Sequence, residues 1–163
     1  MIDNRETGFK ESVIEDVLNE KGFVVAHPKG WSMRPFLRAD DTVVLVKTRG
    51  EDVKVWDCVL FTRTDGVKVL HRAIKISADK ILTRGDYEKN FDAPVPKENV
   101  LAVMTEYYRG KKHVSVSDPS YIKKTKRWNG RGRKIRLFFY RSFIKIAYYV
   151  DLVFLRLFKR SAK

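Results

Sequence analysis

The first pattern along the chain is a helical one near the N-terminus. Apolar residues recur at helical spacing between residues 8 and 21. This pattern predicts an amphipathic helix that packs one face on the rest of the protein, within an N-terminal segment of residues 1–22. Thr7 can cap the start of this helix, and Gly22 can end it in a left-handed conformation. The apolar positions are Phe9, Val13, Ile14, Val17 and Leu18.

The pattern changes to short β-rich runs over residues 23–112. These runs are separated by turns rich in Gly, Asp and Pro, and "RTDGVK" places an Asp-Gly pair between two of them, which predicts a hairpin. No crossover helix fits between the runs, so a mainly β fold is expected, with a compact antiparallel sheet or barrel-like domain. The runs are FVVAH, DTVVLVK, DCVLFTR, VKVLHRAIKI, KILTR and VLAVMTEYYR.

Two further segments follow this domain. Residues 113–134 are polar and basic and are expected to form a connector. Residues 135–160 are again rich in aliphatic and aromatic residues, but charges interrupt them. No stretch of about 18 uncharged residues occurs here, so a spanning helix is disfavoured and a basic amphipathic helix is expected.

The charges of this C-terminal helix fall on one side. At 100° per residue, Arg141, Lys145, Arg156 and Lys159 lie within a stripe of about 60°, and Asp151 lies at its edge. The rest of the circumference is apolar. Such a helix is typical of one that lies in a membrane interface with its basic side toward lipid phosphates.

The net charge of +14 supports the same interpretation. Residues 1–120 are nearly balanced, with 20 Lys and Arg against 19 Asp and Glu, whereas residues 121–163 hold 14 against one. An anionic membrane surface is therefore the expected partner of the tail, in peripheral association and on the cytoplasmic face. Two alternatives remain open. The helix could pack on the β domain or on a second copy, and the basic run could bind nucleic acid, which is the least favoured because no binding module is recognisable.

Composition limits the remaining possibilities. A chain of 163 residues suits one domain with appendages, and its single cysteine, Cys58, excludes an internal disulfide. The opening stretch "MIDNRETGFK" contains no apolar segment, so neither a secretory signal nor a membrane span is expected there. Three scattered histidines and one cysteine have no ligand spacing, so no metal or cofactor is expected.

Candidate chemistry begins at Ser32 in "KGWSMRPFL", just before a predicted strand. A nucleophilic serine needs a base, a group that orients the base, and donors for the oxyanion. His71 is the histidine that lies in a strand pattern, and Asp86 and Asp92 follow in the turn-rich loop "RGDYEKNFD". Each signal alone is weak, because strand histidines are usually structural and loop aspartates usually cap turns.

The order of the segments strengthens the signal. "GWSMRPFL", "WDCVLF", "LHRAIKI" and "LTRGDYEKNFDAPVPKENVLAVM" resemble the successive motifs of type I signal peptidases, in the endoplasmic-reticulum and archaeal-type branch. The resemblance covers roughly residues 23–112. It implies a signal-peptidase fold and cleavage of a peptide bond by a Ser-His-Asp triad through an acyl-enzyme.

The resemblance also assigns roles to residues. Ser32 matches the nucleophile, His71 the general base and Asp92 the triad acid, while Asp86 matches an aspartate that supports the loop and is a second candidate for the acid. An imidazole is mostly neutral at pH 7 and can accept the serine proton. The backbone N–H of Ser32 is expected to meet the oxyanion.

Four further residues are expected to shape or bind at the site. Met33 and Pro35 match the turn that directs the nucleophile, and Arg72 matches the residue beside the base. Trp31, with Gly30, replaces the Ser-Gly pair frequent in the family, so Trp31 is expected to shape the pocket.

Two other departures concern the rest of the chain. Trp56 replaces a glycine in "WDCVLF", and the N-terminal membrane anchor of the family is not found, so the C-terminal helix is expected to replace it. The sequence therefore predicts a membrane-associated serine endopeptidase that cleaves a signal or leader peptide, with small residues before the cut. The alternative is a non-catalytic β domain that binds a partner and is tethered to membrane or nucleic acid by its basic tail.

Overall fold

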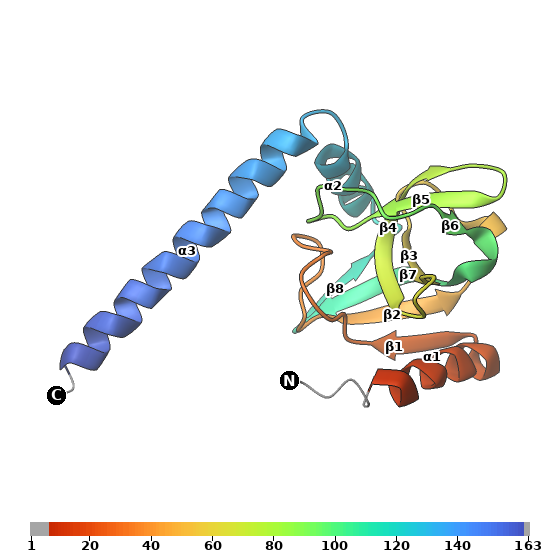
Figure 1. Cartoon of the computed structure of the whole chain (residues 1–163), viewed down its shortest axis with the longest axis horizontal. Helices are drawn as coiled ribbons and strands as arrows, with labels where there is room; N and C mark the ends of the chain where they lie inside the picture. The colour runs from red at the N-terminus through yellow and green to blue at the C-terminus, as the bar shows by residue number, and fades with distance from the viewer. Residues whose placement is uncertain (1–6, 162–163) are drawn as a thin grey trace. The chain divides into compact units, whose positions relative to one another are not determined.

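The computed structural model describes the backbone of residues 7–161 and the side chains of residues 13–150. The chain divides into two compact units, Met1–Lys126 and Arg127–Lys163. Figure 1 shows the helices and strands of both units. In chain order they are α1 (Thr7–Lys21), β1 (Phe23–Ala26), β2 (Thr42–Lys47), η2 (Gly50–Asp52), β3 (Cys58–Thr62), β4 (Lys68–Ile76), β5 (Lys80–Arg84), β6 (Val95–Pro96), η3 (Lys97–Asn99), β7 (Val100–Arg109), β8 (Lys112–Ser115), α2 (Pro119–Asn129) and α3 (Arg133–Ser161).

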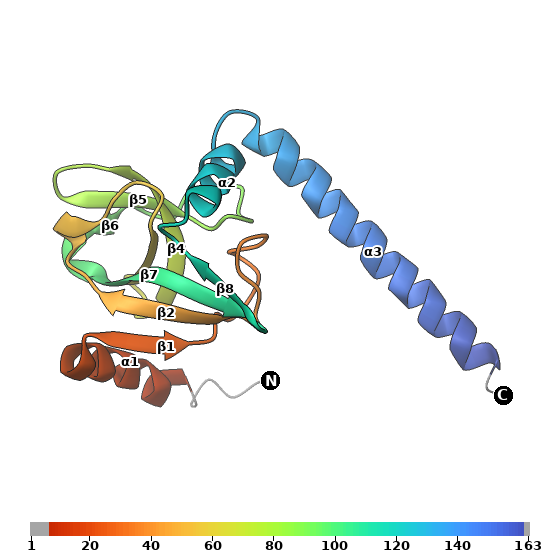
Figure 2. The ribbon, with the colours of Figure 1, turned by 180° about the vertical axis from the view of Figure 1, so that it is seen from behind.

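The described strands form one antiparallel sheet in the order β1-β2-β7-β3-β4-β5-β6, and β8 pairs with β7. The long strand β7 lies at the centre, because it pairs with β2, β3 and β8. The sheet curls on itself, as both views show (Figures 1 and 2). The expected mainly β fold with helices at both ends is confirmed.

The predicted runs correspond to β1, β2, β3, β4, β5 and β7, and the Asp-Gly turn joins β3 to β4 as expected. In that turn Gly66 has a φ of +83°, and Arg63 N–H donates to the Val67 carbonyl at 2.9 Å. The short strands β6 and β8 were not predicted, because β6 has only two residues and β8 lies almost entirely in the segment interpreted as a polar connector.

Helix α1 packs on the sheet through part of the apolar face that the sequence predicted. Leu18 is buried, Ile14 packs against the same core, and Val13 is exposed. Gly22 ends the helix with a φ of +76°, as expected, and its N–H donates to the Leu18 carbonyl at 3.1 Å. The side chains of Thr7 and Phe9 lie outside the described residues.

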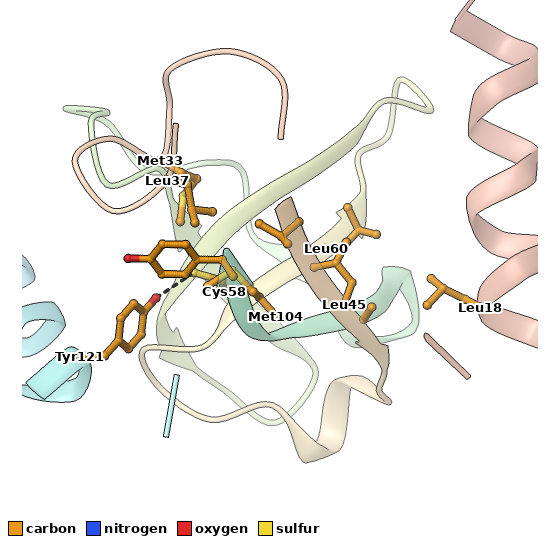
Figure 3. Close-up of a cluster of buried hydrophobic side chains, with 11 residues drawn as sticks. Leu18, Met33, Leu37, Leu45, Cys58, Leu60, Met104 and Tyr121 are labelled. Carbon is orange, nitrogen blue, oxygen red and sulfur yellow. Dashed lines mark hydrogen bonds between the residues drawn. The ribbon is translucent and has the colours of Figure 1, made fainter. Parts of the chain in front are cut away.

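The main core joins this helix to the sheet, to the turn before β2 and to α2 (Figure 3). The contribution of α2 differs from the expected polar connector over residues 113–134. Tyr121 and Thr125, one helical turn apart, are both buried. The basic residues between them hide this short buried stripe in the sequence. The buried members of the core are Leu18, Met33, Leu37, Val43, Leu45, Cys58, Leu60, Ala102, Met104, Tyr107 and Tyr121.

The second unit contains the end of α2 and the long helix α3, which agrees with the helix expected over residues 135–160. A short turn joins them, in which Gly132 has a φ of +75°. The Arg136 guanidinium donates to the carbonyls of Trp128, Gly130 and Arg131, so it satisfies the C-terminal end of α2. The Trp128 and Tyr140 rings meet edge to face at 5.6 Å.

Helix α3 exposes a long series of apolar side chains. None of the described helices is long and apolar enough to cross a membrane. The side chains of Asp151, Arg156 and Lys159, which the sequence placed on or beside the basic stripe, lie outside the described residues. The exposed apolar residues of α3 are Ile135, Phe138, Phe139, Phe143, Ile146, Tyr148, Tyr149 and Val150.

Candidate active site

Ser32 lies in a tight turn between β1 and β2. Gly30, with a φ of +79°, starts the turn, and a hydrogen bond of 3.0 Å from the Leu37 N–H to the Met33 carbonyl continues it. Met33 and Leu37 are both buried in the main core. These two anchors fix the backbone that follows Ser32, while Ser32 itself stays partly accessible.

His71 and Asp92 come together beside this turn. His71 lies on β4 and is largely buried, and its Nδ1 is 2.8 Å from Asp92 Oδ2. The Thr83 hydroxyl, from the buried face of β5, donates to the same Oδ2 at 2.7 Å. An ionised carboxylate has only acceptors, so the His71 Nδ1 carries the proton and Nε2 is left as the basic nitrogen. Of the two expected carboxylates, Asp92 is therefore the one that the structure brings to His71.

The ionisation of Asp92 follows from its contacts. Partial burial raises the pKa of its carboxyl, but the hydrogen bonds from His71 and Thr83 outweigh burial and hold the pKa below its usual value. Asp92 is consequently charged at neutral pH, as a group that stabilises an imidazolium must be.

A backbone segment ties the serine turn to the His71 ring. The Tyr87 N–H donates to the Ser32 carbonyl at 2.7 Å. A Cβ added at Gly85 would lie 2.6 Å from the Ser32 carbonyl oxygen and 3.1 Å from His71 Nε2. Both groups therefore converge on the same point, where only a glycine fits. This explains in physical terms why the Gly-Asp loop carries a glycine.

The second expected carboxylate, Asp86, lies in a fully buried ion pair with Arg72. Arg72 Nε donates to both Asp86 oxygens at 2.9 and 3.0 Å, and Nη2 donates to Oδ2 at 2.6 Å. Further donors of Arg72 reach the Trp56 carbonyl at 2.7 Å and the Tyr121 hydroxyl at 3.3 Å. Burial lowers the pKa of Arg72, but the adjacent carboxylate more than offsets this and keeps the pKa well above its usual value.

This pair fixes the loop after β5 to the sheet and to α2. Arg72 is fully buried, so its side chain lies within the protein interior and not on the wall of the cleft described below. The Cys58 thiol is 3.8 Å from the Tyr121 hydroxyl, and burial raises the pKa of Cys58 to about 11. Cys58 is therefore a protonated core residue rather than a nucleophile.

The remaining expected site residues divide between core and surface. Met33 is buried, and Pro35 is half-buried after a cis peptide bond. Trp31 is 53% exposed, and the Arg34 guanidinium lies 3.9 Å from its ring centroid. Trp31 is not among the described residues that line the cleft, so the expectation that it shapes the pocket is not met in this conformation.

Trp56 adopts a backbone conformation that suits glycine. Its φ is +83°, and it is the only described residue other than glycine with a positive φ. Its N–H donates to the Ala73 carbonyl and its own carbonyl accepts from Arg72. Trp56 therefore places a side chain on a strained backbone position beside the buried ion pair.

Ser32 and His71 both line a cleft of about 490 Å³. Its floor is apolar and includes Met33, Leu45 and Leu60, whose side chains are shown in Figure 3. A larger and more open groove of about 930 Å³ lies by α1, η2 and η3, but none of the expected catalytic residues is among the described residues that line it. The smaller cleft is therefore the candidate site.

Two residues of this region were missed by sequence reasoning. The sequence contained one indication of Thr83, because it lies two positions after Ile81 in a strand and so shares the inward face of β5. Tyr121 gave none, because its partners are distant in sequence.

No group of three or more His, Cys, Asp or Glu that could hold a metal ion occurs among the described residues. Comparisons of the chain with protein-family models, with curated proteins and with solved structures found no match.

Proposed function

We propose that this protein is a serine endopeptidase in which Ser32 is the nucleophile, His71 the general base and Asp92 the triad acid. The observation that carries the proposal is the His71–Asp92 hydrogen bond of 2.8 Å, together with the position of the opposite ring nitrogen, 3.1 Å from where a Cβ of residue 85 would lie beside the Ser32 carbonyl. The order of motifs that resembles type I signal peptidases supports it, and the curled sheet is compatible with a fold of that kind.

In the proposed reaction, His71 Nε2 takes the Ser32 hydroxyl proton as Oγ attacks the scissile carbonyl carbon. Asp92 holds the tautomer and stabilises the imidazolium, and Thr83 holds the Asp92 oxygen that faces the ring. The imidazolium then protonates the leaving amine, which leaves an acyl-enzyme on Ser32. Water, deprotonated by the same ring, hydrolyses the ester and restores the free serine.

The proposed substrate is a signal or leader peptide joined to a precursor, and the proposed site of action is a membrane surface. Helix α3 supports the second part, because it exposes a series of aromatic and aliphatic side chains within a strongly basic segment. We propose peripheral association with anionic lipid at the cytoplasmic face.

The test uses the purified full chain and a library of leader-like peptides with small residues at varied positions. Ser32→Ala and His71→Ala are expected to abolish cleavage, while wild type yields two products with a new amino terminus. Ser117→Ala and His113→Ala are matched controls, because both residues are exposed and lie outside the cleft. Equal cleavage by wild type and Ser32→Ala would refute the proposal and leave the non-catalytic binding domain as the better account.

A further inference from the structure

The charged side chains that line the candidate cleft are of one sign. Four Lys or Arg residues line it and no Asp or Glu does so among the described residues. This is not a consequence of the overall charge, because residues 1–120 hold 20 basic and 19 acidic residues. The positive lining is therefore a local property of the cleft. The four are Lys29, Arg38, Arg63 and Lys68.

Two of these cations are already paired. Lys68 Nζ is 2.9 Å from Glu15 Oε1, and Arg63 forms an ion pair with Asp65. Within the described part of the chain, no carboxylate is paired with the side chains of Lys29 or Arg38. Their charges are consequently available to a ligand.

The two available cations lie on either side of Ser32 in the same segment between β1 and β2. Both are exposed, and both border the apolar floor of the cleft. A peptide that placed apolar residues on this floor and carboxylates at either end would match the site in polarity and in charge.

We infer that the peptide bound in this cleft is acidic, with Asp or Glu residues flanking a short apolar segment. The inference rests on the proposed function for the identity of the site, but it concerns binding and does not require turnover. Lys29 and Arg38 are its specificity-determining residues.

Binding is measured with the full-length Ser32→Ala variant and three fluorescent peptides. The peptides share a central segment of Ala and Val and carry Asp, Ser or Lys at both flanks. The acidic peptide is expected to bind about tenfold more tightly than the neutral one at low salt, since two exposed charge pairs contribute a modest amount each. This difference should shrink at high salt.

The charge-reversed variant Lys29→Glu with Arg38→Glu, in the same background, should reverse the order and favour the basic peptide. Lys111→Glu with Lys112→Glu is the matched control, because it changes the net charge equally at exposed positions outside the cleft and should keep the acidic preference. Equal binding of the three peptides, binding of none, or an order unchanged by the cleft reversal would each overturn the inference.

Cleavage of the same peptides by wild type separates the two proposals. In one outcome, wild type and Ser32→Ala both bind the acidic peptide preferentially and with equal affinity, but wild type does not cleave it. The peptidase proposal then fails and the acidic ligand stands. If the three peptides bind equally and wild type cleaves the neutral peptide at the same rate as the acidic one, the peptidase stands and the acidic preference fails.

Discussion

The substitution Asp86→Asn tests whether the two aspartates of the β5–β6 loop have different tasks. Both Asp86 and Arg72 are completely buried, and three N–H donations join them. An asparagine keeps the shape of the side chain but removes its charge and replaces one acceptor oxygen with a donor. The guanidinium is then left in the interior without an anion, and one of its N–H groups faces another donor.

The expected loss of unfolding free energy is large because both side chains are shielded from water. Breaking a buried ion pair by removing one partner costs about 3–5 kcal/mol. A typical domain has a total stability of only about 5–15 kcal/mol. For a chain of this size each kcal/mol lowers Tm by about 2–4 °C, so Asp86→Asn should lower Tm by about 6–20 °C.

Thermal and urea unfolding, followed by circular dichroism, measure this loss. Asp65→Asn is the control, since the Arg63–Asp65 pair is exposed and its loss should change Tm little. Replacing both partners, Arg72→Met with Asp86→Leu, should recover part of the stability, because no charge is then left unpaired. A Tm of Asp86→Asn within the error of wild type would refute the reasoning.

The remaining predictions concern the acid, the backbone and the tail. Asp92→Asn should lower kcat by about 10³–10⁴-fold while lowering Tm less than Asp86→Asn, because it disturbs the imidazole and not the core; similar activity to wild type would contradict this. Folding lowers the pKa of Asp92, so its contribution to stability is complete above about pH 4 and is lost as the pH falls through that lowered pKa. In urea titrations, wild type should lose this part of its unfolding free energy at acid pH, and Asp92→Asn should not. Trp56→Gly should be about 1 kcal/mol more stable than Trp56→Ala, since both remove the indole and only glycine relieves the positive φ; the reverse order would exclude backbone strain there. Deleting residues 130–163 removes α3 but keeps α2 and its buried Tyr121. The shortened protein should no longer bind anionic liposomes and should still cleave peptides. Continued co-sedimentation with the liposomes would exclude the interfacial role of α3.

The sequence by itself determined the class of fold and the approximate extent of α1, of α3 and of most strands. Short β-rich runs bounded by turn residues indicated six of the strands, and Gly22 and the Asp-Gly turn marked where the chain must adopt a positive φ. These features depend on neighbours a few residues away, so they can be read locally. Residue types in order also selected Ser32 and His71 as candidates for chemistry.

The tertiary structure alone decided which groups meet. The loop residues themselves do not separate Asp86 from Asp92, and only the resemblance to signal peptidases favoured Asp92. The register of β4 and β5 brings Asp92 to His71, 21 residues away, and buries Asp86 on Arg72. Tyr121 reaches Arg72 across 49 residues, which no local pattern can reveal. Pairings of this kind depend on strand register and on the packing of α2, because hydrogen bonds and ion pairs require atoms within about 3 Å, and only the folded chain sets those distances.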